Sequence, residues 1–146
     1  LNKNLVLLYT GLERTAHDIA KSFIHKLQSS KKNHIKEIAS FVREGERLLN
    51  NGNSEDFGRL LNESWIEKKT LSPLISNSSI DTIYRLAIKR GAIGGKLLGA
   101  GGDGFLLFYV PYYKQKSFIR YFNKLINIPF NFSTEKSNII FKNYNK

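Results

Sequence analysis

Apolar residues in the first ninety positions of the chain form one compact run and four stretches with helical spacing. The compact run, Leu5 to Tyr9, ends at a Thr-Gly pair and predicts a buried strand followed by a turn. In the four stretches, apolar side chains recur every three or four residues, which predicts amphipathic helices. The helices are expected over residues 16–27, 35–49, 54–65 and 79–88, with Ser54 and Ser79 as N-caps of the last two.

Beyond residue 91 the apolar residues occur in shorter runs. Gly95 to Leu98 and Phe105 to Val110 predict two strands on either side of a glycine-rich loop. Lys114 to Ile126 returns to helical spacing, and Phe130 to Phe132 and Ile139 to Phe141 predict two short closing strands. This order of elements predicts an α+β fold with an antiparallel sheet packed against helices.

The loop between the two central strands has four glycines within positions 99–104. Because glycine adopts backbone conformations closed to other residues, such a loop can direct successive N–H groups at one anion. Its spacing satisfies the dinucleotide-binding fingerprint, but that motif requires a helix after the loop, where this chain predicts a strand. The NTPase phosphate loop is excluded because Leu97 follows Lys96 where a hydroxyl residue is needed. A glycine hairpin or bulge without a ligand is the alternative.

Three segments of the chain carry a resemblance to the GHMP kinases. The stretch from Lys96 to Phe105, Lys-Leu-Leu-Gly-Ala-Gly-Gly-Asp-Gly-Phe, resembles the third, C-terminal motif of that superfamily. Tyr9-Thr10-Gly11 with Arg14, and Glu63-Ser64-Trp65 with Lys68-Lys69, resemble two further motifs of its sugar kinase branch, which includes heptose phosphate kinases. The three segments occur in the family's order and span most of the chain. Asp103 stands where the family pattern usually has glycine, and a carboxylate there would repel a phosphate.

The resemblance implies a ferredoxin-like GHMP kinase C-terminal domain. Residues 1–146 would then be a single domain, the C-terminal half of a kinase whose N-terminal half is absent. In the family, that other half carries the ATP-binding serine-rich loop and the catalytic aspartate. We therefore expect no catalytic residue in this chain, and we expect ATP and Mg2+ to be bound mainly by the other half.

The resemblance also implies which residues line the site. The residues expected near the nucleotide phosphates are Lys96, Gly99, Ala100, Gly101, Gly102, Asp103 and Gly104. Those expected at the sugar phosphate are Thr10, Gly11, Arg14 and Lys68. Each has a structural alternative, namely a lysine reaching solvent or a helix start with a surface arginine, and Trp65 is expected in the core.

Composition narrows the class of protein. With 146 residues the chain is long enough for one domain, and without cysteine it has no disulfides and no thiolate metal sites. The three histidines show no zinc-ligand spacing, so no metal site is expected in the chain. No signal peptide and no apolar run long enough to span a bilayer is visible, and we expect a cytoplasmic protein without a membrane partner.

The net charge of +11 suggests anionic partners. The lysines are dispersed rather than clustered in a recognisable motif, so nucleic acid is not the expected partner. The expected partners are ATP, a sugar phosphate and the kinase's own N-terminal domain. The implied reaction is phosphorylation of D-glycero-D-manno-heptose 7-phosphate at its anomeric hydroxyl. The alternative is a non-catalytic module that binds an anion or RNA.

Overall fold

The computed structural model describes residues 1–11, 16–27, 29–102 and 104–133. The strands are β1 (Leu5–Tyr9), β2 (Gly94–Leu97), β3 (Phe105–Tyr109) and β4 (Ile126–Asn127). The α-helices are α1 (Ala16–Ile24), α2 (Lys32–Asn50), α3 (Ser54–Lys69), α4 (Ser78–Lys89) and α5 (Tyr112–Tyr121). Two 3-10 turns, η1 (Asn2–Asn4) and η2 (Pro73–Ile75), complete the described elements.

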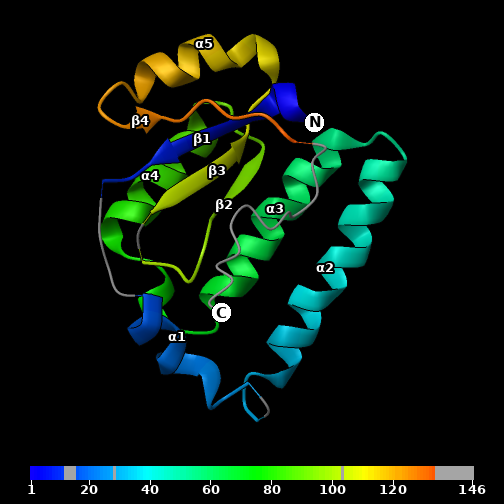
Figure 1. Ribbon diagram of the computed structural model, residues 1–146, viewed down its shortest axis with the longest axis vertical. Coiled ribbons are helices and arrows are strands. Elements are labelled where there is room, and N and C mark those ends of the chain that lie inside the picture. The colour runs from blue at the N-terminus through cyan, green and yellow to red at the C-terminus, as the bar shows by residue number, and fades with distance from the viewer. Residues whose placement is uncertain (12–15, 28, 103, 134–146) are drawn as a thin grey trace, which may run out of the picture.

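The four strands form one antiparallel sheet in the order β2-β3-β1-β4 (Figure 1). Helices α1 to α4 lie between β1 and β2 in sequence, and α5 lies between β3 and β4. A sheet in this order, with helical connections after the first and third strands, is the ferredoxin-like arrangement. The predicted α+β, ferredoxin-like fold is confirmed.

One face of the sheet is buried under α4 and α5. Alternate residues of the two central strands point to this face, because side chains of a strand alternate between its two sides. Val6, Leu8, Leu106 and Phe108 are at most 3% exposed. A chain of ring contacts joins the sheet to the helices, running through Trp65, Tyr84, Phe108, Phe118 and Phe122 with centroid separations of 4.9–6.1 Å. Trp65 has no exposed surface, which confirms its predicted place in the core.

The opposite face of the sheet is only partly covered. Leu7 and Leu107 are paired in register there, and both are partly exposed. Tyr9 and Phe105 stack at the end of the same face, 5.1 Å between ring centroids. Lys96 pairs with Leu107 in the ladder, so its side chain shares this open face. The face therefore carries an apolar floor with a lysine at one side.

The C-terminal part of the chain departs from the predicted pattern. The helix predicted over Lys114 to Ile126 is α5, which starts earlier, at Tyr112, and ends at Tyr121, because the chain then makes a tight turn in which Leu125 donates to the Phe122 carbonyl. The closing strand is β4 rather than the predicted Phe130 to Phe132, which forms no strand. The last printed hydrogen bond of this pairing is the one from the Ile128 N–H to the Leu7 carbonyl, and Pro129 follows. The predicted strand Ile139 to Phe141 lies outside the described residues.

Helix α3 lies against the edge strand β2 at a very close distance (Figure 1). The approach is possible because glycines face each other: a Cβ atom on Gly94 would collide with the Gly58 carbonyl oxygen, and one on Gly58 would lie 2.7 Å from Cγ of Tyr109. The Tyr109 ring is held in place, because its hydroxyl is 2.9 Å from both Asn4 Nδ2 and Ser54 Oγ. The position of α3, and of every side chain it presents to the sheet, depends on this contact.

Gly58→Ala is therefore expected to destabilise the protein by about 1–3 kcal/mol, because the added methyl group overpacks the contact with Tyr109. The matched control is Gly45→Ala in α2, whose Cβ would meet Phe57 and Leu60 at 3.4–3.5 Å. Helix propensity should make that change neutral or stabilising by up to about 1 kcal/mol. Urea unfolding of both variants measures the difference, and equal stability of the two would contradict this account of the α3–β2 contact.

Candidate phosphate-binding site

The glycine loop joins β2 to β3 at the end of the sheet. Its described glycines all have left-handed φ values, 73° at Gly99, 121° at Gly101, 79° at Gly102 and 96° at Gly104. Side-chain-bearing residues rarely adopt these angles, so the density of glycine is a requirement of the backbone path. Asp103 lies outside the described residues.

The loop is held in position by the segment that leads into α4. Gly101 lies directly on Ile75, where a Cβ atom would be 2.7 Å from the Ile75 carbonyl oxygen. That oxygen accepts a 2.8 Å hydrogen bond from the Gly102 N–H. Asn77 donates from Nδ2 to the Gly102 carbonyl, also at 2.8 Å. These contacts fix the middle of the loop against a fully buried residue of the core.

Asn77 is also the N-cap of α4. The predicted N-caps of α4 and α3, Ser79 and Ser54, are both wrong. Its Oδ1 accepts from the Ile80 N–H at 3.0 Å, whereas the sequence predicted Ser79 as the cap. The helix begins at Ser78, so the residue in the capping position is Asn77 and Ser79 already lies inside the helix. Ser54 is not a cap either; it is the first residue of α3, and its hydroxyl meets Tyr109 instead.

Two lysines from different elements meet beside the loop. Lys68, in the last turn of α3, donates from Nζ to the carbonyl oxygen of Gly99 over 2.5 Å. Lys96, on β2, donates from Nζ to Ser64 Oγ over 3.3 Å. Both side chains are half-buried. In the part of the chain that the structure describes, neither lysine forms an ion pair with a carboxylate.

Burial and mutual repulsion change the acidity of these lysines. Loss of solvation, the larger cause, and the positive charge of Lys96 together lower the pKa of Lys68 from 10.5 to about 8. Burial also lowers the pKa of Lys96. Two half-buried cations that have no carboxylate partner among the described residues are costly, and an anion placed between them and the loop would reduce that cost.

The structure brings Thr10 to the same end of the sheet. Its N–H donates to the Gly104 carbonyl at 2.9 Å, which extends the β1–β3 ladder to the end of the loop. Gly11 follows with a left-handed φ of 72° and open space around its Cα. Thr10, Gly11, Lys68, Lys96 and the loop are thus near one another, as expected from the sequence, whereas Arg14 lies outside the described residues.

Two polar residues of the site were not predicted from sequence, Ser64 and Asn77. Ser64 is four residues before Lys68 on α3 and therefore on the same side of the helix, a spacing that could have indicated it. Within the described ranges no three His, Asp or Glu side chains are grouped as a metal site would require. The charged groups that the described residues bring to the loop are the two ammonium groups of Lys68 and Lys96.

Comparison with known proteins decides the family. The family model described as GHMP kinases C terminal matches residues 46–124, more than half of the chain. The chain belongs to this family. Its match includes α3, α4, the glycine loop and α5, so both lysines of the site lie within the part that defines the family.

Individual relatives agree with this assignment. A D-glycero-alpha-D-manno-heptose 7-phosphate kinase from Campylobacter jejuni is 33% identical over 127 residues, which cover 85% of this chain and 37% of the relative. An L-fucokinase/L-fucose-1-P guanylyltransferase from Bacteroides fragilis is 31% identical over 104 residues, covering 69% of this chain and 11% of the relative. The mevalonate kinase structure from Methanococcus jannaschii superposes with a TM-score of 0.69 at 27% identity, covering 86% and 39%. The chain thus spans well under half the length of these relatives.

The low pKa of Lys68 gives a prediction for stability. Between about pH 8 and 10.5 the folded state holds less proton on Lys68 than the unfolded state, so stability should rise with pH in this window relative to a Lys68→Met variant. Thermal unfolding of both proteins from pH 7 to 10.5 measures this. Parallel Tm–pH curves would contradict it. In Lys96→Met the pKa of Lys68 should rise but stay below 10.5, since burial is the larger cause.

Proposed function

We propose that this chain is the C-terminal part of an ATP-dependent kinase that phosphorylates a sugar phosphate. The observation that carries the proposal is the rigid glycine loop beside Lys68 and Lys96, two cations that lack a carboxylate partner among the described residues. Phosphoryl transfer needs positioned donors around the phosphates more than it needs covalent chemistry. The glycine loop, with the ammonium groups of Lys68 and Lys96 beside it, would supply such donors.

The substrate proposal rests on the relatives. The curated relative from Campylobacter jejuni is named for heptose 7-phosphate, and the loop, tryptophan and lysine motifs match the same branch. We propose D-glycero-D-manno-heptose 7-phosphate as the substrate, phosphorylated at the anomeric hydroxyl. Lys68, Thr10 and Gly11 would contact the sugar phosphate, with Arg14 proposed beside them. Lys96 and the loop, Asp103 included, would lie at the nucleotide phosphates.

ATP and Mg2+ would be held mainly by another domain, which would also supply the base that takes the proton from the sugar hydroxyl. The described residues fit the phosphate end of such a complex, because every side-chain donor beside the loop is cationic or neutral. When bound, ATP supplies the transferred phosphoryl group and Mg2+ neutralises its charge. This chain would form one wall of the site. Its two lysines would neutralise the negative charge of the phosphates that remains after Mg2+ is bound.

Nothing proposed for this domain needs a membrane. No helix among the described residues is long and apolar enough to cross a bilayer. Work in the cytoplasm remains our prediction.

The test is a coupled ATP-turnover assay on the protein that contains this chain together with its N-terminal half. We expect turnover with heptose 7-phosphate and little with galactose, fucose or mannose 6-phosphate. Turnover with one of those three sugars instead would reject the heptose assignment and keep the kinase. No turnover with any sugar would reject the kinase. The 146-residue chain alone is expected to be inactive.

Substitutions of neighbouring lysines test whether Lys68 and Lys96 act in the site or only add to the general positive charge of the protein. Lys68→Met and Lys96→Met should each reduce kcat/KM at least about tenfold, since a hydrogen bond to a charged group is worth about 1.5–3 kcal/mol. Lys69→Met is the matched control, because Lys69 pairs instead with Asp81 at 3.1 Å. Its kcat/KM should stay within about twofold. Equal losses in all three variants would contradict the assigned roles.

A further inference from the structure

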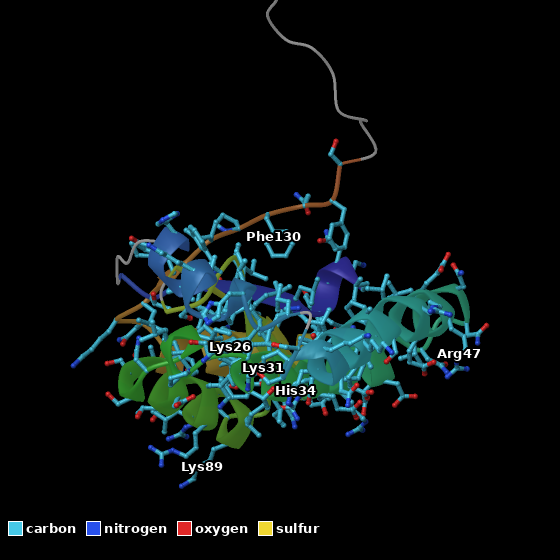
Figure 2. The ribbon with its side chains drawn as sticks, turned by 90° about the horizontal axis from the view of Figure 1, so that it is seen from below. Lys26, Lys31, His34, Arg47, Lys89 and Phe130 are labelled. Carbon is cyan, nitrogen blue, oxygen red and sulfur yellow. The ribbon has the colours of Figure 1, made fainter. Side chains whose placement is uncertain are left out.

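A second concentration of positive charge lies at the far end of α4 from the glycine loop. Four cations, Lys89, Arg90, Lys114 and Arg120, line a pocket of about 570 Å³ between the end of α4 and helix α5, together with Tyr121. Lys89 is exposed at the end of α4 and projects outward from the body of the protein (Figure 2). Helix α4 has twelve residues, so this pocket is about 18 Å from the helix start that holds the loop. The two sites are separate.

The cations around the pocket are held by specific contacts. The guanidinium carbon of Arg90 lies 3.9 Å from the ring centroid of Tyr121, a close cation–π contact that joins α4 to α5. The stem of Lys114 lies on the backbone of Gly91, where a Cβ atom would be 2.7 Å from Lys114 Cδ. Gly91 has φ of 101°, so the turn after α4 both requires glycine and leaves room for Lys114. Two of the four cations therefore have defined positions.

Among the residues that the structure describes, no acidic side chain pairs with these cations. Helix α5 contains no Asp or Glu, and the single acidic residue of α4, Asp81, lies in its first turn, where it pairs with Lys69. None of the four pocket cations forms an ion pair with any residue that the structure describes. The pocket thus gathers four cations that lack a carboxylate partner among the described residues, on a protein with a net charge of +11.

Helix capping explains only part of the cluster. Cations stabilise the C-terminal end of a helix, which accounts for Lys89 in the last turn of α4 and for Arg90 at its C-cap. Lys114, however, is in the first turn of α5, where the helix dipole disfavours a cation and no acidic residue compensates. Its side chain instead reaches the C-terminal end of α4 at Gly91, with Nζ 5.6 Å from the Tyr113 ring centroid, so its charge is added to those of Lys89 and Arg90.

We propose that this pocket binds a small ligand that carries two or more phosphate groups. Its volume is in the range of small-molecule pockets, about 300–1,000 Å³. Four cations around one hollow match the charge of a di- or triphosphate better than that of a single phosphate. Free polyphosphate and the phosphate chain of a nucleotide share this chemistry.

Inorganic tripolyphosphate is the first probe, titrated into the 146-residue chain at 150 mM salt by calorimetry. The pocket variant is Lys114→Gln with Arg120→Gln. The matched control is Lys116→Gln with Lys124→Gln, which removes the same charge from exposed positions on and just after α5 that do not line the pocket. A third variant, Lys68→Met with Lys96→Met, removes binding at the glycine loop, and thermal unfolding of all variants verifies the fold.

We expect the pocket variant to lose one binding event, with an affinity loss of at least about tenfold, while the matched control changes less than about threefold. This event should persist in the Lys68/Lys96 variant. Lys89→Gln with Arg120→Gln, both exposed, replaces the pocket variant should the latter unfold.

Competition with nucleotides identifies the source of the phosphates. If ATP or GTP competes with tripolyphosphate for this binding event, the ligand is a nucleotide. If tripolyphosphate binds and neither nucleotide competes, the ligand is free polyphosphate.

Three results would overturn the proposal. Equal losses in the pocket variant and its matched control would show that only general positive charge attracts the probe. Loss of all binding in the Lys68/Lys96 variant would place the only site at the glycine loop. Tighter binding of a 20-nucleotide RNA than of tripolyphosphate, lost in the pocket variant, would assign the surface to nucleic acid instead.

Discussion

The contact between Gly101 and Ile75 determines where the glycine loop lies, and the rest of the site follows from it. Ile75 is fully buried, so its backbone cannot shift without disturbing the core. A residue with a Cβ atom at position 101 would hold the loop away from that backbone. The hydrogen bond from Gly102 to Ile75 then fixes the loop's direction. A flexible glycine sequence becomes a rigid element because one side of it is part of the core.

Asn77 joins the loop to helix α4 through the two ends of one amide group. Its oxygen caps the helix and its nitrogen holds the Gly102 carbonyl. Aspartate would cap as well but has no donor for the loop, and serine is too short to make both contacts. A single side chain therefore holds both the start of α4 and the backbone of the glycine loop. This explains why the helix starts where it does rather than at the more conventional serine cap nearby.

Much of the fold follows from the sequence, since β1 has its predicted bounds and Trp65 its predicted burial. Helical spacing even separates the adjacent lysines: Lys68 is four residues after Ser64 and meets the loop, while Lys69 is four residues after Trp65 and lies over its ring at 5.6 Å. Residue spacing could not predict which segments far apart in the sequence pair or form hydrogen bonds with one another. The strand β4 is two residues long and pairs with the open edge of β1, and Asn77 holds the loop through a hydrogen bond to Gly102, 25 residues away. Such features depend on tertiary contacts that local pattern does not encode.

The strand order has a consequence for how the chain reaches its folded state. β1 is the first strand of this sheet along the chain, yet its neighbours on both sides, β3 and β4, come about a hundred residues later. Until those residues leave the ribosome, the apolar run from Leu5 to Tyr9 has no strand to pair with. Closing so long a loop is slow, because its entropy is lost before the pairing energy is gained. Biogenesis of this domain therefore includes an interval in which an aggregation-prone strand must be kept unpaired, by helices α1 to α4 folding first or by a chaperone.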